Sequence, residues 1–187
     1  MSDKLYWHFL PDDGRLANGD GRQVQVGETL RIEGEPVLCK HGFHASENIL
    51  DALGYAPGAL ICRVRLGGKI IEDADKAVAA ERTVLWMANA ERELRLFACW
   101  SVRNTPLADG RTVWDLLADK RSQTAVEVAE RYADGLATYD ELAAARDAAW
   151  DAARAASWNA AWAAAWNAAW DAQNLHLEAV FAALGGE

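Results

Sequence analysis

The stretch SWNAAWAAAWNAAWDAQ, residues 157–173, places a tryptophan at every fourth position in a background of alanine. The four residues are Trp158, Trp162, Trp166 and Trp170. An α-helix turns about 100° per residue, so each step drifts about 40° and the rings stay on one broad face. Four tryptophans present roughly 800–1,000 Å² of apolar surface, more than soluble monomers usually expose. The stretch therefore predicts a helix whose tryptophan face is covered.

Two kinds of partner can cover this face. The chain's own N-terminal domain, or a helix folded back on itself, would make the contact structural. A second copy or a partner protein would make it an interface. A period of four exceeds even the 11-residue repeat of right-handed supercoils, so a long left-handed coiled coil fits poorly. The sequence leaves both coverings open.

Charge and hydropathy exclude two classes of partner. The chain has 19 Lys and Arg against 28 Asp and Glu, a formal net charge of −9, which works against binding a phosphate backbone. Its longest apolar region, around residues 155–170, contains Ser157, Asn159 and Asn167, and it falls short of the roughly 20 apolar residues that a membrane span needs. We expect no nucleic-acid partner and no membrane span.

The cysteines and the N-terminus indicate a cytoplasmic protein. Cys39, Cys62 and Cys99 are odd in number and far apart. The opening MSDKLYWHFLPDDG has neither the basic start nor the apolar run of a signal peptide.

The sequence of the N-terminal half predicts short strands and turns. Three short segments are strand candidates: KLYWHFL (residues 4–10), ETLRI (28–32) and PVLC (36–39). The segment ALICRVRLGGKIIE (59–72) alternates apolar and polar residues, and Gly67-Gly68 is expected to form a hairpin turn within it. One helix is expected between these strands, with Ser46 as its N-cap and Gly54 at its end.

After Trp86 the pattern becomes helical. Thr112, Ser122 and Thr138 are expected to cap helices, Thr138 through the capping box Thr138-Tyr139-Asp140-Glu141. Gly135 is expected to end the second of these helices. We therefore predict an α+β protein: a small mixed α+β domain over residues 1–86, followed by an all-helical region over residues 87–187 that ends in a long Ala/Trp helix.

The stretch LCKHGFHAS gathers the strongest candidates for chemistry, Cys39, His41 and His44. On a strand, Cys39 and His41 would share a face and His44 would point to the other, which does not close a zinc tetrahedron. Cys39 as a nucleophile with His41 as its base meets the same problem, because residues i and i+2 diverge. We expect no metal, and expect the histidines to satisfy local hydrogen bonds.

Residues 27–86 resemble a domain of unknown function that recurs in phage and bacterial genomes. The residues that match its pattern, a Cys shortly before Gly-Phe-His, then a Tyr, a Gly and a Lys, are Cys39, Gly42, Phe43, His44, Tyr55, Gly68 and Lys76. Residues 94–150 resemble an uncharacterised bacterial helical segment that often precedes an Ala/Trp/Arg tail. The two resemblances imply a phage or prophage association and bring no established activity.

The order of motifs also resembles that of ADP-ribosyltransferases. Tyr6-Trp7-His8 corresponds to the early His beside an aromatic residue, and Gly42–Ser46 with Tyr55 to the middle strand and the helix that follows it. Glu72 or Glu81 would supply the catalytic carboxylate. This resemblance implies an enzyme that uses NAD, with His8, Tyr55 and Glu81 in its site.

Taken by themselves, the residues favour a non-enzymatic binding protein without a cofactor, and the resemblances imply that it has a phage or prophage origin. Its partner would be another protein or a second copy, and Trp158, Trp162, Trp166 and Trp170 would carry the interaction. The NAD-dependent enzyme is the alternative, and a cavity where His8, Tyr55 and a carboxylate converge would favour it.

Overall fold

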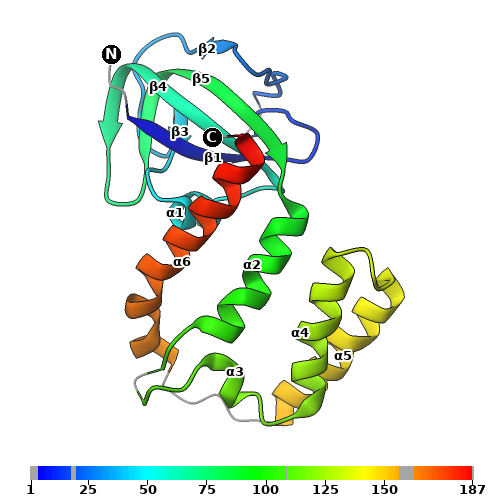
Figure 1. Cartoon of the computed structure of the whole chain (residues 1–187). Helices are drawn as coiled ribbons and strands as arrows, with labels where there is room; N and C mark the ends of the chain where they lie inside the picture. Colours follow the sequence, from blue (N-terminus) through cyan, green and yellow to red (C-terminus); the bar gives the residue numbers. More distant parts are fainter. Residues whose placement is uncertain (1–3, 18–19, 108, 156–161, 187) are drawn as a thin grey trace. The chain divides into compact units, whose positions relative to one another are not determined.

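A computed structural model describes residues 4–17, 20–107, 109–155 and 162–186, with the side chains of 150–169 outside the description. Its contacts divide the chain into two compact units (Figure 1). The first unit combines residues 1–91 with Leu177–Glu187, and the second is Arg92–His176. The last helix therefore contributes to both units.

The first unit is built on an antiparallel sheet of five strands. Their order is β1-β4-β5-β2, and β3 also pairs with β5. The strands are β1 (Leu5–Leu10), β2 (Thr29–Arg31), β3 (Phe43–Ala45), β4 (Leu60–Glu72) and β5 (Ala77–Asn89). The two long strands β4 and β5 form its centre, and β4 is the segment that the alternating pattern marks most clearly.

The period of two along β1 gives the sheet two different faces. Tyr6 and Leu10 lie in the main hydrophobic core with Cys62 and Val64 of β4. The intervening Trp7 and Phe9 contact Phe181 of α6 (Trp162–Gly185), with ring centroids 6.3 and 6.5 Å apart. The C-terminal turns of α6 are thus part of the packing of the first unit.

Two details of this contact show how closely α6 fits. Leu177 and Phe181 are fully buried. A Cβ at Gly185 would overlap the ring of Trp86, so the helix approaches the sheet where it has no side chain.

The predicted hairpin at Gly67-Gly68 is wrong. The strand continues through these glycines to Glu72, with a register irregularity between Gly67 and Ile70. Gly68 adopts a φ of 67°, which suits a bulge, and the chain reverses later, where Asp73 N donates to Lys76 O at 2.8 Å. The paired glycines bend the strand instead of ending it.

The predicted start of the first helix is also wrong. Helix α1 (Ile49–Gly54) begins after Asn48, and it ends at Gly54 as predicted. The backbone of Ser46 instead pairs with that of Trp7, at 2.7 and 2.9 Å, which ties β1 to the end of β3. The expected strand PVLC is a turn over residues 38–40, where Cys39 has a φ of 58°.

The remaining helices are α2 (Glu91–Asn104), α3 (Val113–Leu116), α4 (Lys120–Ala133) and α5 (Tyr139–Ala155). The predicted caps at Thr112 and Thr138 are confirmed, and both form capping boxes: Thr112 N donates to Asp115 at 2.7 Å, and Thr138 N to Glu141 at 2.7 Å. Ser122 is not a cap, because Asp119 accepts from Arg121 N and starts α4 three residues earlier than predicted. Gly135 follows the end of α4 with a φ of 72°.

The α+β class is confirmed, with the sheet in the N-terminal part and a helix at the C-terminus. The predicted domain boundary after residue 86 falls inside β5. Trp158 lies outside the described residues, and so do the side chains of Trp162 and Trp166; Trp170, in α6, is partly buried. Among the described residues, none of the helices is both long and apolar enough to cross a membrane.

Candidate functional site

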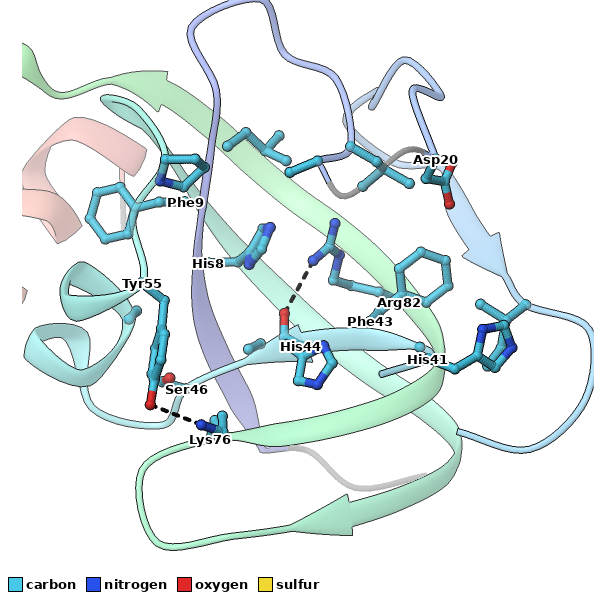
Figure 2. A pocket seen from close by; sticks show the side chains of 18 of the residues that line it. His8, Phe9, Asp20, His41, Phe43, His44, Ser46, Tyr55, Lys76 and Arg82 are labelled. Carbon is cyan, nitrogen blue, oxygen red and sulfur yellow. Dashed lines mark hydrogen bonds between the residues drawn. The ribbon is translucent and has the colours of Figure 1, made fainter. Parts of the chain in front are cut away.

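A cavity of about 960 Å³ opens in the first unit. Its walls come from β1, β3, β5 and the end of α1, together with the loops before and after β2 (Figure 2). Segments far apart in sequence, from Trp7 to Arg82, line it. A volume of this size accommodates a small organic ligand.

Arg82 of β5 is the most unusual residue of the cavity wall. Its side chain is 1% exposed, and its guanidinium lies 5.2 Å from the ring centroid of Phe43. Nη1 donates to the backbone oxygen of His44 at 3.2 Å, whereas Nε and Nη2 have no hydrogen-bond partner among the described residues. Burial lowers the pKa of Arg82 to about 10, so it remains a cation at neutral pH.

His8 of β1 lies beside Arg82 in the cavity (Figure 2). Burial holds the pKa of His8 well below its usual range, and the charges of Arg82 and His44 lower it further. The ring is therefore neutral at pH 7, and it offers one donor and one acceptor nitrogen.

The candidates of the LCKHGFHAS stretch are drawn into local contacts. Cys39 N donates to His44 Nε2 at 2.9 Å, which places the proton of a neutral His44 ring on Nδ1. Burial lowers the pKa of His44, which favours that neutral form. The ring of His41 reaches Glu33 O at 2.9 Å. In the described parts of the chain, no group of three or more His, Cys, Asp and Glu side chains is placed to hold a metal ion.

Tyr55 and Lys76 form a second polar cluster on the cavity wall (Figure 2). Lys76 Nζ donates to Tyr55 Oη at 2.9 Å and lies 4.5 Å from the centroid of the same ring, while Tyr55 Oη donates to Asp75. These contacts raise the pKa of Lys76 and lower that of Asp75, each chiefly through its hydrogen bond with Tyr55. Lys76 Nζ also lies 3.7 Å from Asp75 Oδ1, so the charge of Lys76 is already balanced by a carboxylate of the chain.

The cavity brings together two of the three residues that the ADP-ribosyltransferase resemblance marks. His8 and Tyr55 both line it. Glu81 is not among its lining residues, and its carboxylate accepts from Arg31 Nε at 3.1 Å. Its neighbour Arg82 lines the cavity instead, because successive residues of a strand point to opposite faces.

The charges around the cavity are mostly positive, although the whole chain carries −9. The basic side chains of the lining are Arg22, Arg31, Lys40, Lys76 and Arg82, and the acidic ones are Asp20 and Glu33. Asp20 is already engaged, because both its oxygens accept from Arg22, at 2.7 and 2.8 Å. The local charge therefore favours an anion.

Sequence reasoning missed Arg82, although a signal for it existed. One face of β5 is formed by every second residue, Val78, Ala80, Arg82 and Val84. Arg82 therefore occupies a position on a face that is otherwise apolar. A charged residue in such a register is rarely buried without a partner.

Residues 14–95 match the sequence model of a family described as a domain of unknown function (DUF7666). The predicted resemblance of residues 27–86 to a domain of unknown function is thus confirmed in its coarse form. The match includes Arg82, His44, Tyr55 and Lys76, and begins after His8. No curated protein and no solved structure matches the chain.

Proposed function

We propose that this protein is a non-enzymatic binding protein whose first unit takes up a small anionic ligand in the cavity beside Arg82. The observation that carries the proposal is a cation that is 1% exposed and has no carboxylate partner among the described residues. Burying a charge without a partner costs several kcal/mol on an order-of-magnitude scale. An anion in the cavity would offset that cost.

The neighbouring cations support the choice of Arg82 as the anchor. Arg22 is bound to Asp20, Arg31 to Glu81, and Lys76 lies near Asp75. Each of these three has an anionic partner from the chain itself. Lys40, the remaining basic residue of the lining, is exposed to solvent. Arg82 is buried and has only a backbone oxygen, so its charge is the one that a ligand would neutralise.

Benzoate and benzamide test the proposal, because they have nearly the same shape and differ in charge. We expect NMR titration to show saturable binding of benzoate, with shifts at cavity residues, and little binding of benzamide. Arg82→Gln should abolish the difference between the two compounds. Arg103→Gln is the matched control, because Arg103 also lies near an aromatic ring, that of Trp114 at 4.0 Å, but is already paired and does not line the cavity. Equal binding of the two compounds, or an unchanged Arg82→Gln variant, would refute the proposal.

NAD-dependent ADP-ribosyl transfer is the second candidate. It is favoured by the presence of His8 and Tyr55 in one cavity. It is weakened by Glu81, which is paired with Arg31. Calorimetry that detects NAD binding in the micromolar range, lost in His8→Ala and Tyr55→Ala, together with label transfer that is lost in Glu81→Gln, would support this enzyme over the binding protein.

The tryptophan-striped segment is proposed to bind a second copy or to pack on the chain itself. Changing Trp162 and Trp166 to Ala should cost about 3–5 kcal/mol for each ring that is packed. A melting temperature that rises with protein concentration would indicate a second copy, since mass action stabilises only an assembly. Unchanged melting and solution mass in the double variant would show that the face is free for another protein. The phage association stays a prediction, which the neighbouring genes would test.

A further inference from the structure

We infer that the anionic group of the ligand is a carboxylate or a phosphate, held by two parallel hydrogen bonds on the Nε–Nη2 edge of Arg82. The inference rests on the proposed function and adds the chemical class of the ligand and the way it is held. It depends on geometry as well as charge.

The guanidinium of Arg82 is held from two sides. The ring of Phe43 lies against it, and Nη1 donates to His44 O at 3.2 Å. The two nitrogens that remain, Nε and Nη2, belong to one edge of the planar group. This edge therefore has a set direction in the cavity wall.

Other arginines of this chain show what such an edge binds. Arg22 Nε and Nη2 donate to the two oxygens of Asp20 at 2.7 and 2.8 Å. Arg103 Nε and Nη2 donate to the two oxygens of Glu130 at the same distances. Arg121 uses the same two nitrogens on Asp119, at 3.1 and 2.7 Å. Only at Arg82, among these four, does the edge have no carboxylate.

This arrangement selects oxyanions with two oxygens in one plane. Carboxylates and phosphates match the fork of a guanidinium, whereas a neutral amide supplies a single acceptor and no charge. Both nitrogens lie beneath the cavity surface. The bound ligand is therefore expected to shift the side chains between the edge and the open cavity.

The variants Arg82→Lys and Arg82→Gln separate this inference from the proposed function. Lysine keeps the positive charge but lacks the fork. With benzoate and phenyl phosphate as probes, we expect Arg82→Lys to lose affinity at least tenfold and Arg82→Gln to lose binding. Arg103→Lys, the control at a paired arginine that does not line the cavity, should leave both affinities unchanged. If Arg82→Lys binds as tightly as the native protein while Arg82→Gln does not, charge alone holds the ligand and the inference fails. If neither variant changes binding, the proposed function fails as well. The probe that binds more tightly identifies the natural group as a carboxylate or a phosphate.

A measurement on the unaltered protein covers the case in which a variant does not fold. NMR of the arginine Nε–H groups should show one resonance, that of Arg82, shifting downfield and resisting exchange when phenyl phosphate is added. A crystal structure of the complex should place two ligand oxygens about 2.7–2.9 Å from Nε and Nη2. A probe seated near Lys40 or Lys76, with the resonance of Arg82 unmoved, would overturn the inference.

Discussion

Arg82 of the first unit and Arg103 of the second are similar residues in different surroundings. Each guanidinium lies over an aromatic ring, Phe43 at 5.2 Å and Trp114 at 4.0 Å. Arg103 is one-third exposed and its charge is met by Glu130. Arg82 is buried and has no carboxylate among the described residues. The comparison indicates that Arg103 has a structural partner within the chain. The cavity beside Arg82, where such a partner is missing, is therefore the place where a ligand is expected.

The two units also differ in what holds them together. The first has a continuous hydrophobic core with many side chains removed from solvent. Among the described residues, the second has fewer buried apolar side chains, and its contacts include capping boxes and surface ion pairs such as Arg92–Asp134 and Arg131–Glu141. Caps and exposed ion pairs each contribute only about 1 kcal/mol or less. Substitutions in the first unit should therefore have the larger effects.

The largest effect is expected at the contact between α6 and the sheet. Phe181→Ala should lower the free energy of unfolding by about 3–5 kcal/mol, because it opens a cavity against Trp7 and Phe9. Leu175→Ala, in the same helix but 69% exposed, should change it by only about 0.5 kcal/mol. Urea denaturation measures both. Equal effects would show that α6 does not contribute to the core of the first unit.

Two glycines with positive φ sharpen the comparison. Gly42 has a φ of 117°, and a Cβ there would lie 2.7 Å from Val78 Cγ2, so Gly42→Ala should cost about 3 kcal/mol from strain and overlap. Gly110 of the second unit has a φ of 84° and no described atom within 4 Å of its Cβ position. Gly110→Ala should cost about 1–2 kcal/mol, from the backbone alone. Thermal unfolding distinguishes the two, and a larger loss at Gly110 would contradict the packing around Gly42.

His8 in the cavity should contribute to the pH dependence of stability. The pKa of His8 is well below its usual range in the folded protein and near 6.5 in the unfolded chain, so the unfolded chain binds the proton more readily. Stability should therefore fall as the pH drops below about 6.5, by at most about 1.4 kcal/mol per pH unit for this residue. His8→Gln should flatten the slope between pH 7 and 5. If His8→Gln leaves the slope unchanged, the folded protein binds the His8 proton as readily as the unfolded chain does, and the cavity does not lower the pKa of His8.

The smallest effect, but the most direct test of the comparison, is at the two arginines. Arg103→Met should lower stability by about 0.5–1 kcal/mol, because it removes a partly exposed ion pair. Arg82→Met should leave stability unchanged or raise it, because it replaces a buried, uncompensated charge with an apolar chain. The denaturant midpoints of the two ligand-free variants measure whether each substitution lowers or raises the stability. A marked loss in Arg82→Met would assign Arg82 a structural role in place of a binding one.

Local features of this fold could be predicted from the sequence because their causes lie within a few residues. Thr138 and Glu141 stand at the spacing of a capping box, and their hydrogen bonds form as expected. The alternation along residues 60–72 marks a strand whatever lies around it. The same local reasoning went wrong at Gly67-Gly68, where pairing with β5 carries the strand past a plausible turn.

By itself, the sequence determined the α+β class, most of the long elements and the acidic, tryptophan-rich character of the chain. Only the tertiary structure decided that Phe181 packs on Trp7 and Phe9, that Tyr55 shares a cavity with His8, and that Arg82 is buried there while Glu81 is paired outside it. Caps, turns and strand periods arise from hydrogen bonds and steric limits between near neighbours. Burial and charge compensation depend on residues brought together from distant parts of the chain, and that assembly decides which arginine lacks its carboxylate.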